Sequence, residues 1–500
     1  MGTAPISRRA ARESASTRPR SSKTSPTVDP ATGAPIAATE PKGIAALVRK
    51  HPTAWLASAL AVAFLVLGTG AVFAGAALGG GAPEVEASSA AVADTSRAVP
   101  EELPASMRLR TCSIAALASD PRLMSLKGYV MNAATGDVLF SREGEVPNRT
   151  GSVMKVLTAA AAISALGPDY QLSTRVFAGS SESTVVLVGG GDPTLSALPA
   201  GAESVYGGAP KLSDLAAQVN AAHSGPITDI VLDATYWSVA DKWDSSWKRS
   251  EQTIGYHSEV TALMVDGDRS DPARATSPRS TDPVMRAGRA FAEALGYPDA
   301  TLTLGAATGT AMLGEVKSQP VKTLIGQMLP SSDNTLAEML ARVVSKQAGL
   351  NGSAASLQQA IPGALDGYGV DVAGLVIRDG SGLSDLNAVP PKFVAELMVK
   401  INEGGQNLNI VFNSLPVSGQ SGSLAGRFTG ANAIARGAVT AKTGWIDTAY
   451  TLGGVVRAQD GSTLTFAFYA IGDGIRDNAR AAIDTLTTGV FSCGDNLSNN

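Results

Sequence analysis

The sequence predicts an α+β fold in which both ends of the exported chain contribute to one sheet, preceded by a single transmembrane helix. Three observations support this. Strand-like runs with turn signals occur early, at residues 127–133 and 138–142, and again late, at residues 438–443, 448–457 and 463–471. Helical patterns lie between them, at residues 283–295, 321–328 and 334–347. An uncharged apolar run precedes all of these segments. Strands at both ends with helices between them indicate one mixed sheet closed by the two chain ends.

The apolar run extends from Ala54 to Leu78, and a spanning helix needs about 20 such residues. Residues 1–50 carry nine Arg and Lys side chains against three acidic ones, so this end should stay in the cytoplasm. A cleaved signal peptide is the alternative, since small-residue sites such as Ala74-Gly75-Ala76 occur here. The lengths of the basic and apolar stretches favour an uncleaved anchor. We expect a disordered basic cytoplasmic tail (residues 1–52), a transmembrane helix (53–79), a flexible linker (80–108) and an extracytoplasmic remainder.

The basic tail is the only feature that favours a nucleic-acid partner, and its place beside the apolar run indicates a role in topology instead. The chain has two cysteines, Cys112 and Cys493, near the ends of the exported part. Thiols outside the cytoplasm tend to pair, so we expect a disulfide between them, with two unpaired thiols as the alternative. With only three histidines and no C-x-x-C, neither a Cys/His metal site nor a cofactor is expected.

The first candidate motif is Ser152-Val153-Met154-Lys155, at the start of an apolar helical pattern that ends at Leu166. A serine hydroxyl is a poor nucleophile until a neighbouring base takes its proton. Residues three apart share one face of a helix, and burial among apolar side chains lowers the pKa of an amine. Lys155 is therefore the candidate base for Ser152. For an isolated motif of this kind, a serine that caps a helix and a solvated lysine are the ordinary alternative.

Two further motifs follow, Ser332-Asp333-Asn334 and Lys442-Thr443-Gly444. A hydroxyl and an amide before a helix can relay a proton and hold a peptide group, and a cation with a hydroxyl can bind a carboxylate. Each motif alone is more often a helix cap or a turn, and a second S-x-x-K at Ser245–Lys248, in a polar loop, shows that chance matches occur. All three in this order match the active-site serine pattern of β-lactamases and penicillin-binding proteins.

With these motifs, the chain from Leu109 to Ser492 resembles the class C low-molecular-mass penicillin-binding proteins, the D-alanyl-D-alanine carboxypeptidase/endopeptidase family. Several other stretches are family-like: Leu166–Asp169, Gly189–Leu195, Asp379–Ser384, Leu415–Gly419 and Gly422–Phe428. The resemblance implies a serine β-lactamase/penicillin-binding protein-like transpeptidase fold, with an antiparallel sheet flanked by helices. It further implies a catalytic domain at residues 109–173 and 311–500 and an inserted β-rich domain region at 174–310.

The resemblance also implies roles for the motif residues: Ser152 as nucleophile, Lys155 as its base, Ser332 and Asn334 as the second element, and Lys442 and Thr443, with Gly444, at the substrate carboxylate. The backbone N–H groups of Ser152 and Trp445 would hold the oxyanion. Substrates would be peptidoglycan stem peptides ending in D-Ala-D-Ala, cleaved through an acyl-enzyme, and β-lactam antibiotics would inhibit.

One residue departs from the family pattern. Trp445 stands where the family often has Thr or Ser, so a hydroxyl contact to the carboxylate is lost. A β-lactamase or esterase of the same fold, and a non-catalytic peptidoglycan-binding or sensor protein, remain as alternatives. The balance between carboxypeptidase and endopeptidase activity is left open.

Overall fold

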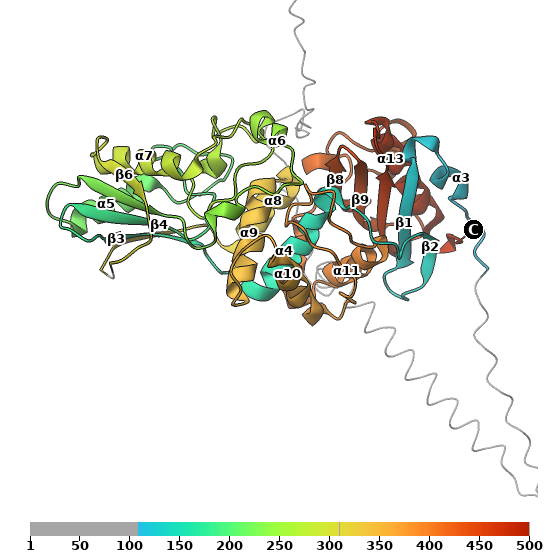
Figure 1. Cartoon of the computed structure of the whole chain (residues 1–500). Coiled ribbons are helices and arrows are strands. Elements are labelled where there is room, and N and C mark those ends of the chain that lie inside the picture. Colours follow the sequence, from blue (N-terminus) through green and yellow to red (C-terminus); the bar gives the residue numbers. More distant parts are fainter. Residues whose placement is uncertain (1–108, 310, 500) are drawn as a thin grey trace, which may run out of the picture. The chain divides into compact units, whose positions relative to one another are not determined.

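The computed structural model describes residues 109–309 and 311–499 (Figure 1). The cytoplasmic tail, transmembrane helix and linker predicted for residues 1–108 lie outside this part of the chain. Within the described ranges, no helix combines the length and the apolar character needed to span a bilayer.

Both ends of the described chain build one antiparallel sheet, in the strand order β2-β1-β10-β9-β8. Its strands are β1 (Ser125–Asn132), β2 (Val138–Arg142), β8 (Val439–Ile446), β9 (Ala449–Arg457) and β10 (Thr463–Ile471). The early hairpin therefore joins the late strands through the β1–β10 pair, in which Ser125 lies opposite Ile471. Both chain ends close the sheet, as the strand pattern predicts, but it is antiparallel, as the family resemblance implies, and not mixed.

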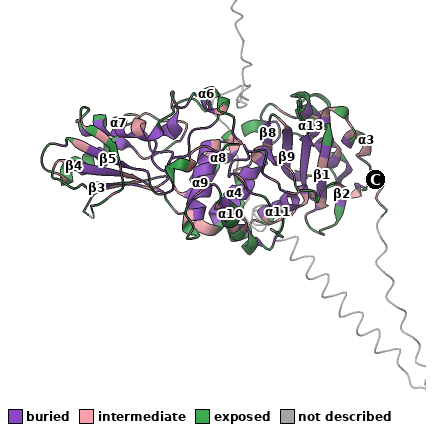
Figure 2. Ribbon diagram, in the orientation of Figure 1, coloured by how far each residue is buried: buried purple, intermediate pink, exposed green. Residues whose placement is uncertain are grey.

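Side chains on the two faces of this sheet enter two different hydrophobic clusters, as period-two alternation requires. Along β10, Phe466 and Phe468 pack in the cluster that includes helix α13, whereas Ala467 and Tyr469 pack in the cluster that includes α11. Figure 2 shows these central strands as buried. The two covering helices are α11 (Pro391–Glu403) and α13 (Asn478–Cys493), and the short α3 (Ala115–Ala118) packs on α13.

A helical layer surrounds α4, the helix that carries the first motif. Its alanines Ala159 to Ala162 are fully buried, which allows close contact with neighbouring helices. The helices of this layer are α4 (Met154–Leu166), α8 (Val321–Ser331), α9 (Asn334–Gln347), α10 (Leu357–Leu365) and α12 (Asn409–Asn413). The contacts of α4 with α8 and α9 bring the first and second motifs to the same place.

A second sheet forms the inserted region, in the order β6-β5-β4-β3-β7, with β4, β5 and β6 parallel. Its elements are β3 (Ser173–Ala178), β4 (Thr184–Gly189), α5 (Leu212–Ala222), β5 (Asp229–Asp233), α6 (Ser250–Ile254), α7 (Pro283–Leu295), β6 (Thr301–Leu304) and β7 (Met312–Lys317). The predicted end of this region at residue 310 is too early, because β7 pairs with β3. The second sheet therefore extends from Ser173 to Lys317, and the inserted region below means residues 173–317.

The middle of the inserted region packs against the helical layer around α4. Trp237, Trp247 and Met264 are buried in the same hydrophobic cluster as helices α4 and α9. The second sheet has its own cluster, which contains Leu187, Leu232 and residues of α5 and α7. The second sheet with α5 and α7 therefore has its own hydrophobic core. The segment that contains Trp237, Trp247 and Met264 shares the core of helices α4 and α9.

The two cysteines form a disulfide between Cys112 and Cys493, across 381 residues of sequence. Cys112 also pairs with the C-terminal segment through its backbone, accepting from Ser498 N at 2.8 Å and donating to Asn496 O at 3.1 Å. The disulfide and these bonds join the start of the described chain to its end.

Candidate active site

Ser152 and Lys155 lie in hydrogen-bonding contact at the start of α4. A single 3-10 turn, Gly151–Val153, carries Ser152 and runs directly into the helix, so Lys155 follows one turn later. Lys155 Nζ lies 2.8 Å from Ser152 Oγ, and the Lys155 side chain is fully buried. The arrangement predicted for the first motif is the one observed.

Two other groups hold the Lys155 amine. Nζ lies 2.6 Å from Asn334 Oδ1 and 2.7 Å from the carbonyl oxygen of Ser381, and both of these atoms can only accept hydrogen bonds. A neutral amine has two N–H donors and one lone pair. With its donors used on Asn334 and Ser381, the lone pair is left for the Ser152 hydroxyl, which is the geometry a general base requires.

Burial favours this neutral form, whereas the nearby carboxylates favour the protonated one. Burial lowers the pKa of Lys155 to about 8, against the opposing pull of the Asp379, Glu338 and Asp333 carboxylates. Near neutral pH a useful fraction of the amine is therefore unprotonated.

The second motif lies between α8 and α9. Ser332 ends α8 with a φ of 59°, a left-handed conformation that is unusual for a residue with a side chain. Asn334 begins α9, and its Nδ2 donates to Tyr256 O at 3.2 Å, which directs Oδ1 towards Lys155. The inserted region therefore orients the amide that holds the catalytic amine.

Asp333, between these two residues, points away from the cleft. Its Oδ1 accepts from Leu336 N at 3.0 Å and caps α9, and its Oδ2 accepts from Arg269 and Tyr206 of the inserted region. The charges of Arg269 and Arg279 lower the pKa of Asp333 despite its burial, so the carboxylate is ionised. Asp333 anchors the motif and leaves Ser332 and Asn334 to face the first motif.

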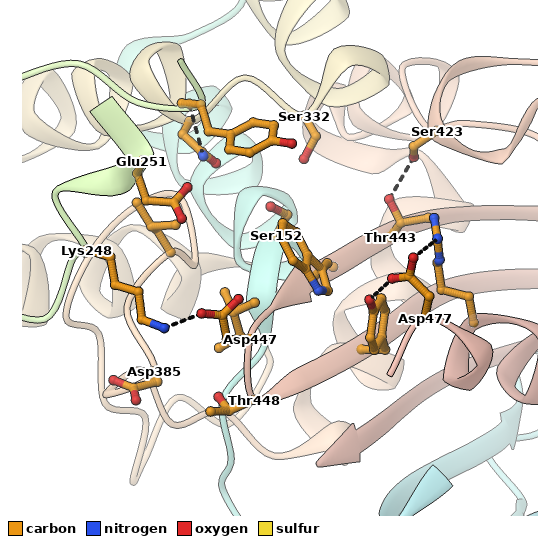
Figure 3. A pocket seen from close by; sticks show the side chains of 18 of the residues that line it. Ser152, Lys248, Glu251, Ser332, Asp385, Ser423, Thr443, Asp447, Thr448 and Asp477 are labelled. Carbon is orange, nitrogen blue, oxygen red and sulfur yellow. Dashed lines mark hydrogen bonds and ion pairs between the residues drawn. The ribbon is translucent and has the colours of Figure 1, made fainter. Parts of the chain in front are cut away.

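Lys442 of the third motif contacts Ser332 of the second motif. Its Nζ lies 2.9 Å from Ser332 Oγ and 2.9 Å from the carbonyl oxygen of Thr443, and the side chain is fully buried. Burial and the nearby charge of Lys155 lower the pKa of Lys442 well below its usual value. Next along β8, Thr443 Oγ1 is hydrogen-bonded to Ser423 Oγ at 2.7 Å (Figure 3).

The backbone of β8 lies against the nucleophile. A Cβ on Gly444 would be 2.8 Å from the backbone nitrogen of Ser152, and one on Gly151 would be 3.0 Å from that of Trp445. Only glycine permits this approach, which places the Ser152 and Trp445 backbones at one wall of the cleft. The Trp445 side chain is 46% exposed and near the rings of Tyr256 and Tyr450.

Residues of all three motifs line one cavity of about 570 Å³. The motif residues that line it are Ser152, Ser332, Asn334, Thr443, Gly444 and Trp445, while Lys155 and Lys442 are buried beside it. Figure 3 shows Ser152, Ser332 and Thr443 around it and the Lys248–Asp447 ion pair at another part of its wall. Lys248, from the other S-x-x-K, therefore binds Asp447 at the cavity, and Ser245 is exposed.

Several residues at the site were not singled out from the sequence. The carbonyl of Ser381 binds Lys155, and the buried carboxylates of Glu338 and Asp379 hold the turn that presents it. The stretch from Asp379 to Ser384 was noted as family-like without a role. Periodicity gives no signal for Glu338, because it lies on the opposite side of the helix from Leu336, Met339 and Leu340, and it is buried only because neighbours surround α9 on all sides.

Comparison with known proteins gives one consistent result. The model of the D-Ala-D-Ala carboxypeptidase 3 (S13) family matches residues 110–277 and 269–490. The chain is 35% identical to carboxypeptidase Rv3627c of Mycobacterium tuberculosis over 418 residues, 82% of this chain and 88% of that protein. It is also 35% identical to carboxypeptidase DacB of Mycolicibacterium smegmatis over 397 residues, 78% and 85% of the two chains.

Among solved structures, the fold resembles that of penicillin binding protein 4 from Haemophilus influenzae, with a TM-score of 0.61 and 19% identity. The match covers 73% of this chain and 95% of the other. A second structure of that protein contains a β-lactam and matches with a TM-score of 0.57.

Proposed function

The chain belongs to the D-Ala-D-Ala carboxypeptidase 3 (S13) family, and from that premise we propose that it is a penicillin-binding serine D-Ala-D-Ala carboxypeptidase acting on peptidoglycan stem peptides. The observation that carries the proposal is the buried Lys155 amine, 2.8 Å from Ser152 Oγ, with its other two contacts made to acceptors. Two relatives that are named carboxypeptidases align with 82% and 78% of this chain.

In acylation, Ser152 Oγ attacks the carbonyl carbon of the D-Ala-D-Ala peptide bond while its proton passes to Lys155 Nζ. The backbone N–H groups of Ser152 and Trp445 stabilise the oxyanion that forms on the carbonyl oxygen. The close approach of Gly151 and Gly444 supports this assignment, because it brings both backbones to one side of the nucleophile.

The leaving amine must receive a proton as the peptide bond breaks. Ser332 Oγ, which is hydrogen-bonded to Lys442, can donate its proton to the departing D-Ala nitrogen. It takes up in exchange the proton that Lys155 received from Ser152, which leaves Lys155 neutral for deacylation. The substrate's terminal carboxylate binds at Thr443, near the Lys442 cation when that amine is protonated. Water then hydrolyses the Ser152 ester, with Lys155 as base, and releases the shortened peptide.

β-Lactams offer the same serine a strained amide, and we expect them to acylate Ser152 and inhibit the enzyme. The β-lactam complex of the Haemophilus influenzae protein, which has this fold, supports that expectation. Release of free D-Ala is carboxypeptidase activity, and release of a cross-linked residue is endopeptidase activity. Both use the same chemistry, and the space beside Trp445 decides which leaving group fits.

The proposed place of action is outside the cytoplasm, with the chain held by the apolar run from Ala54 to Leu78. The disulfide between Cys112 and Cys493 supports an oxidising compartment for the described residues. A reporter that is active only after export, fused at residue 100, tests this topology. Activity of a cytoplasmic reporter at that position would contradict it.

The catalytic proposal is tested with a fluorescent penicillin and residues 109–500 produced in an oxidising compartment. We expect stable labelling of the wild type, located at Ser152 by mass spectrometry, and none of Ser152→Ala. Ser245→Ala is the matched control and should label normally. D-Ala release from a pentapeptide ending in D-Ala-D-Ala is the second readout. Rapid drug turnover would favour a β-lactamase, and labelling without D-Ala release an endopeptidase or a sensor.

A further inference from the structure

Two buried carboxylates, Glu338 and Asp379, hold the turn whose Ser381 carbonyl contacts Lys155. Glu338 is in the second turn of α9, and Asp379 begins the turn that continues through Gly382. Their side chains are almost completely inaccessible to solvent. Burying a carboxylate is costly unless hydrogen bonds or charges compensate, so their contacts indicate what they stabilise.

Glu338 uses one oxygen to hold a pair of peptide groups. Its Oε1 accepts from Gly380 N at 3.0 Å and from Ser381 N at 2.7 Å. The other oxygen, Oε2, makes no hydrogen bond within residues 109–309 and 311–499. The carboxylate of Glu338 therefore fixes the backbone of this turn.

The turn has little freedom elsewhere. Thr158 Oγ1 of α4 donates to the Gly380 carbonyl at 2.6 Å, and Asp379 accepts from Gly382 N at 2.7 Å. A Cβ on Gly382 would lie 1.8 Å from the carbonyl oxygen of Gly151, the residue before the nucleophile. The distance between the Ser381 carbonyl oxygen and Lys155 Nζ is 2.7 Å. Hydrogen bonds at Gly380 and Gly382, on either side of Ser381, hold this carbonyl in place.

The same carboxylates act on the amine by charge. Burial lowers the pKa of Lys155, and the negative charges of Asp379 and Glu338 oppose that effect and keep it at about 8. Burial and the charge of Asp379 also raise the pKa of Glu338 to about 7. Other charged or titratable groups that act on this pair come from several elements: Asp333, Arg342, Lys442, His257 and Arg279.

We propose that Glu338 is a positioning residue for the general base: it holds the Ser381 carbonyl against Lys155 through two peptide N–H groups. Its ionised carboxylate also stabilises the protonated form of that amine. A general base works best when its own affinity for the proton is close to the working pH. Burial lowers the proton affinity of Lys155, and the charge of Glu338 offsets part of that loss. The inference rests on the proposed function, because it requires Lys155 to deprotonate Ser152.

The central experiment measures the pH dependence of acylation by a fluorescent penicillin in the wild type and in Glu338→Gln. The amide retains Oε1 as an acceptor for both peptide groups and replaces Oε2 by a nitrogen. Removing the charge lowers the proton affinity of Lys155, so the acidic limb of the rate profile should move to lower pH by about one unit. The rate on the alkaline plateau should fall several-fold, because the amine is then a weaker base.

A purely structural role predicts a different result. It would lower the rate by one factor at every pH and leave the limb in place, and that outcome, or an unchanged profile, would overturn the proposal. Glu396→Gln is the matched control, since Glu396 is a half-buried glutamate of α11 outside the cavity lining. Its profile should coincide with that of the wild type.

A second variant keeps the test decisive if Glu338→Gln does not fold. Glu338→Asp retains the charge and withdraws the oxygen from Gly380 and Ser381. Its acidic limb should stay near the wild-type position while the plateau falls, and a limb displaced to lower pH would contradict the role assigned to the charge. Failure of wild-type labelling at Ser152 would instead overturn the proposed function, and the inference with it.

Discussion

Arg269 of the inserted region donates a hydrogen bond from its guanidinium to Oδ2 of Asp333 at 2.6 Å, and both side chains are buried. Tyr206 OH donates to the same oxygen at 2.9 Å and accepts from Arg269 at 2.8 Å. Because Asp333 lies between Ser332 and Asn334, this buried ion pair ties the inserted region to the second catalytic motif.

Replacing Arg269 by Met should destabilise the protein strongly. Asp333 would keep its buried charge without its main partner, and breaking such a pair costs about 3–5 kcal/mol. Denaturant unfolding measures this cost, and the acylation rate should fall as Ser332 and Asn334 lose their fixed positions. Arg175→Met is the control: Arg175 of β3 pairs with Glu315 in the same region, and both side chains are partly exposed to solvent, at 47% and 22%. An equal loss in both variants would argue against a specific role for Arg269.

His257 should make the folded protein sensitive to acid. Burial and the positive charge of Arg279 lower the pKa of His257 to about 3, and its ring packs against Trp247 at a centroid distance of 4.5 Å. Between pH of about 3 and 6.5 the unfolded chain binds a proton at this residue that the folded chain does not, so stability is lost as the pH falls.

His257→Phe keeps the ring and removes the titration. The difference in unfolding free energy between pH 7 and pH 4 should be smaller in this variant than in the wild type by about 3 kcal/mol. Other titrating groups are the same in both proteins and cancel in the comparison. Identical pH dependence in denaturant unfolding at the two pH values would show that His257 does not carry the effect.

Removing the disulfide should affect stability far more than catalysis. Cys112 and Cys493 close a very long loop, so the double variant Cys112→Ser/Cys493→Ser should lose about 2–5 kcal/mol of unfolding free energy. Neither cysteine lines the cavity, so the acylation rate below the unfolding transition should not change. Reductant should destabilise the wild type and leave the double variant as it was. A wild type insensitive to reductant would speak against a stabilising bond.

Gly382 should not tolerate a side chain. Its φ is 81°, and an added Cβ would overlap the carbonyl oxygen of Gly151, so Gly382→Ala must displace the turn that holds Lys155. We expect at least a tenfold loss of acylation rate and a lower melting temperature, if a displacement of about 1 Å matters here as in other active sites.

Gly374→Ala is the matched control for this prediction. Gly374 has a similar φ of 76°, but a Cβ there would have no atom within 4 Å. Gly374→Ala should lower the free energy of unfolding by only about 1 kcal/mol, through backbone strain, and leave the acylation rate unchanged. Equal effects of the two substitutions would mean that φ alone, and not the contact with Gly151, explains the glycine at 382.

Local sequence patterns predicted many elements closely. The predicted helices at residues 283–295 and 334–347 and the strand at 463–471 have the observed bounds, because each has a clear period and a recognisable end. The end of the inserted region was misplaced, since β7 carries glycine and charged residues and pairs only at the edge of the second sheet. Edge strands give weak periodicity, and their partners are distant in sequence.

The sequence by itself determined the three motifs, their order and the separation of three that puts Ser152 and Lys155 on one helical face. Tertiary structure alone decided the partners of Lys155, because Asn334 and Ser381 are 179 and 226 residues away. It also decided that Asp333 faces the inserted region and that Glu338 accepts hydrogen bonds from the backbone of Gly380 and Ser381. Hydrophobic periodicity shows which side of an element is buried, but it does not show which distant group that side meets. A backbone carbonyl such as that of Ser381 has no residue-type signature, so only the folded chain reveals its contact.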